Sequence, residues 1–128
     1  MNSTEAYRLE ALLELAAAYP RPLTATSVAR RRGVPEAFLA RLLAGLSRAG
    51  VVAAVRGPGG GVRLARPPET IELATLLPSS RPSEVGGPAV RWLVASLAEG
   101  RARVLRSLTL ASLLRVEREQ AMHPDFVI

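Results

Sequence analysis

The sequence contains no cysteine, and this absence excludes several classes of site. Disulfide bridges, a cysteine nucleophile, and zinc sites or iron–sulfur clusters with cysteine ligands all need a thiol. Histidine occurs once, near the C-terminus, and no pair of carboxylates is placed for acid–base catalysis, since Glu69 and Glu72 lie in a proline-rich linker and are typical surface residues. We therefore expect neither an enzyme nor a protein with a metal or other cofactor.

Long apolar runs and a leader are also missing. No apolar run reaches the roughly 18 residues that a membrane span requires. The first residues, MNSTEAYRLE, lack the basic stretch and apolar block of a signal peptide. Hydrophobic residues make up 48% of the 128 residues but aromatic residues only 4%, so Leu, Val and Ala must build the core. These features predict a cytoplasmic protein with one core and no membrane contact.

Lysine is absent as well, and all 17 basic residues are arginine. Residues 1–66 hold ten Arg and four Glu, whereas residues 67–128 hold seven basic and seven acidic residues. The whole net charge of +6 therefore lies in the first half of the chain. Such an uneven distribution indicates a polyanionic partner.

The first helix is predicted from its two ends. Asn2 and Glu5 have the spacing of a capping box, which predicts a helix that starts near Ser3. Leucines and alanines at a 3.6-residue period continue its apolar face as far as residue 17. The sequence Tyr-Pro-Arg-Pro at residues 19–22 ends it, because proline cannot continue a helix.

Two further helices follow at short spacing. Thr24 or Thr26 can cap the second helix, and Gly33 ends it. Pro35 opens the third helix, which ends at Gly50. Two helices joined by a tight Gly-Val-Pro turn have the outline of a helix-turn-helix, whose second helix enters the DNA major groove.

A short β-hairpin is predicted directly after these helices. Val51–Val55 and Val62–Leu64 form its strands, and the sequence Gly-Pro-Gly-Gly-Gly at residues 57–61 joins them. An ordinary turn needs only one or two glycines, and a phosphate-binding P-loop needs a Gly-Lys-Ser/Thr ending that is missing here. Glycines flanked by Arg56 and Arg63 favour a wing that approaches the DNA minor groove closely.

The C-terminal half predicts a different organisation. Residues 67–88 form a proline-rich linker with a short helical segment around residues 71–77. Residues 89–120 form a long helix, ending near Leu108, and a short terminal helix from Thr109, and residues 121–128 form a tail. The fold class is therefore mainly α with a small β-hairpin: residues 1–66 are a winged helix-turn-helix domain, and a long helix follows. One apolar seam is expected on that helix, made of Trp92, Leu93, Leu97, Val104, Leu105 and Leu108.

The helix-turn-helix interpretation assigns candidate contacts to double-stranded DNA. Arg41 would pair with a guanine edge or a phosphate, and Arg30, Arg31 and Arg32 would clamp phosphates at the end of the second helix, where they also suit the helix dipole. The candidate residues are Thr26, Arg30, Arg31, Pro35, Glu36, Ala37, Ala40, Arg41, Arg56, Gly57, Gly59, Gly60, Gly61 and Arg63.

These motifs together resemble the Rrf-two family of winged helix-turn-helix transcription regulators (the IscR, NsrR and CymR types). The matching stretches are EALLELA, VARRRGVPEAFLARLLAGLSRAGVV, VRGPGGGVRLARPP and LTLASLL, in the family's order across roughly residues 3–114. The resemblance implies a homodimeric DNA-binding regulator. It also implies that the long helix crosses to the partner subunit, with the apolar seam as the dimer interface.

The sequence departs from the family's pattern in three places. Iron–sulfur members carry three cysteines in the stretch that reads LLPSSRPSEVGGPAVRW here, so this chain is not expected to bind a cluster, and Glu84 and His123 are poor substitutes as ligands. Val62 stands where the family often has an aromatic residue. Ala40 and Arg41 replace a Glu-Gln pair with which some members read bases, so the operator sequence cannot be carried over.

The leading hypothesis is a homodimeric, sequence-specific DNA-binding regulator, expected to be a repressor, with activation left open. Its effector would be a small molecule or a protein, because direct thiol redox sensing needs a cysteine. The alternative is a winged-helix adaptor that binds a protein instead of DNA. The concentration of charge in residues 1–66 argues against the adaptor.

Overall fold

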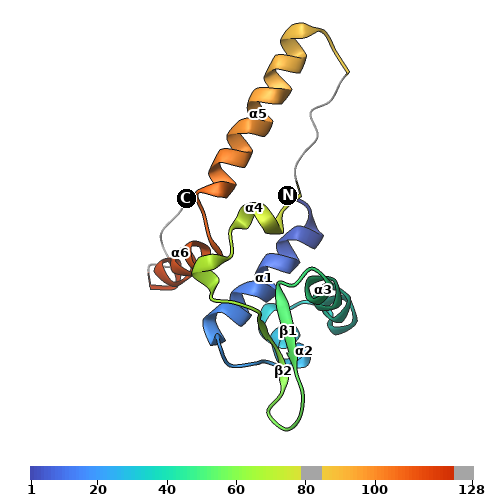
Figure 1. Cartoon of the computed structure of the whole chain (residues 1–128), viewed down its shortest axis with the longest axis vertical. Helices are drawn as coiled ribbons and strands as arrows, with labels where there is room; N and C mark the ends of the chain where they lie inside the picture. Colours follow the sequence, from blue (N-terminus) through green and yellow to red (C-terminus); the bar gives the residue numbers. More distant parts are fainter. Residues whose placement is uncertain (79–84, 123–128) are drawn as a thin grey trace.

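The structure is a computed structural model that describes residues 1–78 and 85–122. It is mainly helical, with one two-stranded antiparallel sheet, as the sequence predicts (Figure 1). The elements are α1 (Ser3–Ala18), α2 (Ala25–Arg32), α3 (Glu36–Arg48), β1 (Val52–Val55), β2 (Gly61–Leu64), the short 3-10 helix η1 (Pro68–Thr70), α4 (Leu73–Leu76), α5 (Pro88–Arg106) and α6 (Leu110–Met122).

Helix α1 lies at the centre of the molecule and supplies much of the core. The capping box is confirmed: the Glu5 backbone N–H donates to Asn2 Oδ1 at 2.9 Å, and the Asn2 N–H donates to Glu5 Oε2 at 3.1 Å. Leu12 and Leu15 are fully buried, and α1 packs against α2, α3, β2 and α6. The helix-turn-helix and the C-terminal helix therefore share one core.

Capping residues determine where the two helices of the helix-turn-helix begin and end. The hydroxyl of Thr24, not that of Thr26, accepts a hydrogen bond from the Ser27 N–H at 3.1 Å and so caps α2. Gly33 ends α2 in the left-handed conformation, with φ of 65°. Pro35 is the N-terminal cap of α3. The tight turn between α2 and α3 is therefore as the sequence predicts.

The β-hairpin pairs Val52 with Leu64 and Val55 with Gly61. A third segment joins it at the root of its loop, where β2 begins, because the Leu23 N–H donates to the Val62 carbonyl and the Val62 N–H donates to the Leu23 carbonyl, both at 2.8 Å. The hairpin projects from the end of the molecule opposite to α5 (Figure 1). The root of the loop is therefore fixed to the segment that leads into α2.

The linker prediction needs correction for residues 67–78. Ile71, Leu73, Leu76 and Leu77 are all at most 5% exposed and belong to the core. Backbone hydrogen bonds also fasten this segment to the α5–α6 connection: the Leu110 N–H donates to the Ile71 carbonyl at 2.8 Å, and the Leu73 N–H donates to the Leu108 carbonyl at 3.0 Å. Although prolines flank the segment, its apolar side chains are buried in the core. The rest of the predicted linker includes residues 79–84, with Glu84, which lie outside the described residues.

Helix α5 projects from the body, with its N-terminal end farthest away, and α6 follows it and packs against α1 within the body (Figure 1). Thr109 precedes α6, and its hydroxyl accepts a hydrogen bond from the Ser112 N–H. Helix α6 continues to Met122, so it is longer than predicted and includes the first two residues of the expected tail. The remaining tail, with His123, lies outside the described residues. Among the helices of residues 1–78 and 85–122, none is long and apolar enough to cross a membrane.

Candidate nucleic-acid interface

One face of α3 is buried and the opposite face is open. Leu39, Leu43 and Leu46 are buried against the core. Successive residues are rotated by about 100° in a helix, which places a second set on the opposite side. All members of that set are exposed, and most are alanines: Ala37, Ala40, Arg41, Ala44 and Arg48. Small side chains between two arginines let a helix backbone come close to a groove floor.

Arg41 rests on an aromatic pair. Its guanidinium carbon lies 5.7 Å from the centroid of the Phe38 ring, and the Phe38 ring meets the Tyr7 ring edge-on, with 5.7 Å between centroids. A cation over an aromatic face at an exposed site contributes about 0.5–1 kcal/mol. The arginine forms no ion pair among the described residues. Phe38 therefore orients the Arg41 guanidinium, and its charge remains available for a contact outside the described part of the chain.

The N-terminal ends of the two helices are joined through their side chains. The Thr26 hydroxyl donates to Glu36 Oε1 at 2.6 Å. Both residues are exposed, as are Pro35 and Ala37. The hydrogen bond fixes the angle at which α3 starts relative to α2. The Glu36 carboxylate thus has a structural partner in addition to any contact with a base.

The glycines of the hairpin divide into two groups. Gly57 and Gly59 have φ of 91° and 73°, and a Cβ added at either would have no atom within 4 Å. Gly60 and Gly61 are required by close packing. A Cβ at Gly60 would lie 2.2 Å from the Val55 carbonyl oxygen, and one at Gly61 would lie 2.3 Å from the Leu23 carbonyl oxygen. The tip is therefore open, whereas the root has no room for a side chain. Only the tip glycines fit the expectation of a free approach to DNA.

The two arginines beside this loop differ. Arg56 is exposed and has no hydrogen bond or ion pair in the described part of the chain. Arg63 is half-buried, and its Nη1 donates to the Leu64 carbonyl at 2.8 Å. From the sequence, both arginines are expected to contact DNA in the same way. In the described part of the chain, Arg56 is the one of the two whose side chain has no hydrogen bond or ion pair.

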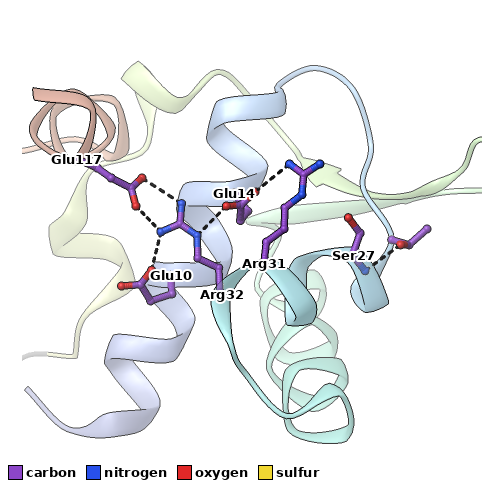
Figure 2. Close-up of polar contacts among 7 residues, drawn as sticks. Glu10, Glu14, Ser27, Arg31, Arg32 and Glu117 are labelled. Carbon is purple, nitrogen blue, oxygen red and sulfur yellow. Dashed lines mark hydrogen bonds and ion pairs between the residues drawn. The ribbon is translucent and has the colours of Figure 1, made fainter. Parts of the chain in front are cut away.

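The arginines that end α2 also have separate roles (Figure 2). Arg30 is exposed, and Arg31 is 61% exposed, with its Nη1 3.6 Å from Glu14. Arg32 is only 13% exposed. The interpretation of Arg32 as a phosphate clamp is therefore wrong, because its guanidinium turns inward to carboxylates.

Arg32 is surrounded by three carboxylates from two helices. Its Nε donates to Glu14 at 2.8 Å and its Nη1 to Glu10 at 2.6 Å, and Nη1 and Nη2 both donate to Glu117 on α6. These hydrogen bonds, that of Glu117 above all, raise the pKa of Arg32 above its ordinary value, although burial acts in the opposite sense. Arg32 therefore stays charged and joins α2 to α1 and α6.

One candidate contact was missed. Arg48 lies on the exposed face of α3, seven residues after Arg41, which returns it to nearly the same side of the helix. Its position in the last turn also suits the helix dipole. The seven-residue spacing in the sequence was the signal that could have found it.

The arrangement of α2, α3 and hairpin can be compared with known proteins. The model of the Rrf2 (Rrf-two) family, described as an iron-dependent transcriptional regulator, matches residues 1–79. This is more than half of the chain. The chain belongs to the Rrf2 family.

Relatives agree with this assignment. The Rrf2 chain is 34% identical over 120 residues to slr0846 of Synechocystis sp., named as an HTH-type transcriptional regulator, with 84% of this chain and 82% of the relative covered. It is 39% identical over 74 residues to the HTH-type transcriptional regulator IscR of Cereibacter sphaeroides, covering 56% of this chain and 48% of that protein. The match thus spans only about half of the length of IscR.

Solved structures extend the likeness to the C-terminal helices. The IscR structure of T. potens matches with a TM-score of 0.81 and 29% identity, covering 93% of this chain and 88% of that one. CymR of B. subtilis, the global cysteine regulator, matches with a TM-score of 0.82 and 27% identity, covering 91% and 96%. These are winged-helix regulators, so the fold predicted for this Rrf2 chain is confirmed.

The iron in the description of the Rrf2 family does not fit the residues of this chain. The sequence has no cysteine, so no thiolate is available for a cluster. Within residues 1–78 and 85–122, no three His, Asp or Glu side chains gather in a way that could hold a metal ion. We therefore derive no role for iron in this Rrf2 protein.

Proposed function

We propose that this chain is a sequence-specific DNA-binding transcription regulator that acts as a homodimer. The observation that carries the proposal is the open face of α3, where Arg41 and Arg48 flank small alanines, beside a hairpin tip with the free Arg56. The α3 face would enter the major groove, and the hairpin would enter the adjacent minor groove, where a narrow A·T stretch attracts arginine.

The phosphate contacts of this proposal come from exposed arginines. Arg30 and Arg31 end α2 on the surface and would bind the phosphates that border the groove. Arg32 has no part in this contact, because its charge is already bound by three carboxylates. The net charge of +6 in residues 1–66 supports a general attraction to DNA, in addition to the individual contacts.

The dimer would form through α5. Leu93, Leu97 and Val104 are 50–65% exposed, and the helical period places them on one side of α5. Such a row of exposed leucine and valine on a projecting helix is typical of an interface. A two-fold dimer would present two α3 helices to half-sites about 34 Å apart, one turn of DNA.

Three of the six residues expected in the apolar seam do not lie on this row. Trp92 is 69% exposed, but the helical period rotates it by about 100° from Leu93 and about 140° from Leu97. Leu105 and Leu108 are partly buried and pack against the core of their own chain. The proposed interface therefore keeps Leu93, Leu97 and Val104.

The test is binding of the purified protein to DNA upstream of its own gene, compared with a random duplex across a salt series. Tighter binding to a palindromic stretch, weakened steeply by salt, is the expected result. Binding of equal strength to both duplexes would contradict sequence-specific recognition. No binding even at low salt would overturn the DNA-binding proposal in favour of a protein-binding adaptor.

A further inference from the structure

A cavity of about 300 Å³ lies directly behind the proposed DNA-binding face. Residues of α1, α3 and α4 and of the connection between α3 and β1 line it. Its volume is at the lower end of the range for small-molecule sites, about 300–1,000 Å³. The cavity is separate from the surface that the proposed DNA contact uses, except at one residue.

The lining combines cations with an apolar surface. Arg8 and Arg41 are both part of the lining, and Leu42, Leu46, Val51 and Leu76 supply apolar side chains. Neither arginine forms an ion pair in the part of the chain that the structure describes. Within residues 1–78 and 85–122, the one hydrogen bond of the Arg8 side chain is a long one, 3.4 Å from Nη1 to the Leu76 carbonyl. In that part of the chain, the two guanidinium groups at the cavity therefore lack a carboxylate partner such as those that Arg32 has.

These features define the chemistry of an occupant. Guanidinium groups bind carboxylates through paired, charge-assisted hydrogen bonds. An apolar wall adds affinity for hydrocarbon and disfavours a bare inorganic anion, because such an ion would lose its hydration there. We propose that this cavity binds a small organic monocarboxylate with an aryl or short alkyl body, and that this ligand is the effector of the regulator.

The position of Arg41 gives the direction of the regulation, and this part rests on the proposed function. Arg41 lines the cavity and also lies on the exposed face of α3. A carboxylate held beside Arg41 neutralises one of the charges that face DNA and draws the side chain away from the groove. Because DNA affinity depends on such charges, the ligand lowers the affinity.

The site is tested on the full chain without DNA, by ¹H–¹⁵N NMR titration with phenylacetate and hexanoate. We expect at least one of them to shift the amide signals of Gly45 and Thr75, which line the cavity, in a saturable manner at a Kd of about 1 mM or tighter. The controls are 2-phenylethanol, which lacks the charge, and acetate, which lacks the apolar body. No saturable shift with either acid, or equal shifts with 2-phenylethanol, would overturn the site.

Variants locate the binding. R8Q removes one cation and is expected to weaken binding about tenfold or more, because a hydrogen bond to a charged group is worth at least that factor. R30Q is the matched control, since Arg30 is exposed and lies outside the cavity. If R8Q fails to fold, G45L narrows the cavity without removing charge, and a Cβ at Gly45 meets nothing closer than 3.8 Å. Unchanged binding in a folded R8Q or G45L variant contradicts the proposal.

The regulatory part is tested by adding the bound acid to the protein–DNA complex. We expect the acid to lower DNA affinity in the native protein but not in R8Q. If the acid shifts Gly45 and Thr75 but the protein binds no DNA, the proposed function fails and the site stands. If the protein binds its operator and neither acid binds the cavity, this inference fails and the proposed function stands.

Discussion

Arg32 Nη2 on α2 lies 3.0 Å from Oε2 of Glu117 on α6, across 85 residues of sequence (Figure 2). Glu10 and Glu14 of α1 bind the same guanidinium. Three helices therefore converge on one charge, and the C-terminal helix is tied to the helix-turn-helix. The arrangement makes Arg32 a positioning residue for α2, since it holds the last residue of this helix, the first of the helix-turn-helix, against the body.

Replacing Arg32 is expected to destabilise the fold. R32Q leaves three carboxylates facing one another without a cation, and we expect the free energy of unfolding to fall by about 3 kcal/mol. E117Q should cost less, about 1 kcal/mol, because Glu117 is 37% exposed and Arg32 keeps two partners. Urea denaturation monitored by circular dichroism measures both variants.

The exposed pair of Arg103 and Glu99 is the control for this cluster. Both side chains are more than 70% exposed and 3.7 Å apart, so R103Q should change the free energy of unfolding by less than about 0.5 kcal/mol.

The raised pKa of Arg32 adds a test by pH. The stabilising charge of Arg32 is fully present below its pKa in the unfolded state, and it is lost only as the pH rises through its pKa in the folded state. Both values lie beyond the usable alkaline range, so an effect of R32Q that vanishes at mildly alkaline pH would contradict the assignment.

The hairpin glycines should differ in their tolerance of alanine. G61A places a Cβ 2.3 Å from the Leu23 carbonyl oxygen and is expected to cost about 2 kcal/mol or more. G59A meets no atom and should cost only the left-handed strain of about 1 kcal/mol. G100A, inside α5 with nothing within 4 Å, should stabilise by about 0.5–1 kcal/mol. Equal losses for G61A and G59A in thermal unfolding would refute the distinction between root and tip.

A charge on the apolar row of α5 should separate the proposed dimer. Leu97 is 65% exposed in the single chain, so L97E causes little strain there but buries a carboxylate in the interface. A95E is the matched control, because Ala95 is exposed and lies two residues after Leu93, which places it on the opposite side of the same helix. Sedimentation velocity should show a dimer for the native protein and A95E, and a monomer for L97E. A native protein that sediments as a monomer would remove the basis of the dimer.

Arg56 should act on DNA through charge alone. R56A is expected to weaken binding uniformly across sequences and to reduce the slope of log affinity against log salt by about 1. The salt slope should not change in R103A, because Arg103 lies on α5 and away from the proposed interface. Fluorescence anisotropy with an operator duplex and a random duplex measures the slopes. A loss confined to the operator would assign Arg56 to a base contact instead.

Arg41 should affect sequence preference. If it reads a base edge, R41A costs about 1–3 kcal/mol on the operator and relaxes the preference at one position. Competition among operators with single-base changes measures this preference. Equal loss on all sequences would assign Arg41 to a phosphate. R48A tests whether the second arginine of the exposed face contributes in the same way.

The parts of the fold that follow local rules were predictable. Asn2 and Glu5, Gly33, and the glycine run at residues 57–61 each mark a cap or turn, and the structure has them as predicted. The order of the elements follows from the same local signals, and the resemblance to the family adds the expected dimer and the crossing of the long helix to its partner. Periodicity could also have separated Trp92 from Leu97, because the rotation of 100° per residue is known from sequence alone.

Other features depend on distant partners and left no local signal. Arg32 looks like its neighbours Arg30 and Arg31 until α6 brings Glu117 beside it. Ile71 and Leu73 stand among prolines without a clear period, so only the completed core shows that they are buried. The cavity behind α3 joins residues as distant as Arg8 and Thr75, and no spacing in the sequence indicates it.

The division of the hairpin into a packed root and an open tip has a consequence for how such a protein can change over time. A Cβ at Gly60 would collide with the backbone of the hairpin itself, and one at Gly61 with the backbone that leads into α2, whereas a Cβ at Gly57 or Gly59 would meet no atom of the described residues within 4 Å. Substitutions at the tip therefore cost little more than the left-handed strain at these two positions, and under the proposed function they alter what reaches the minor groove. Selection could then adjust the choice of target DNA at the tip at a small and local cost in the stability of the domain that carries it.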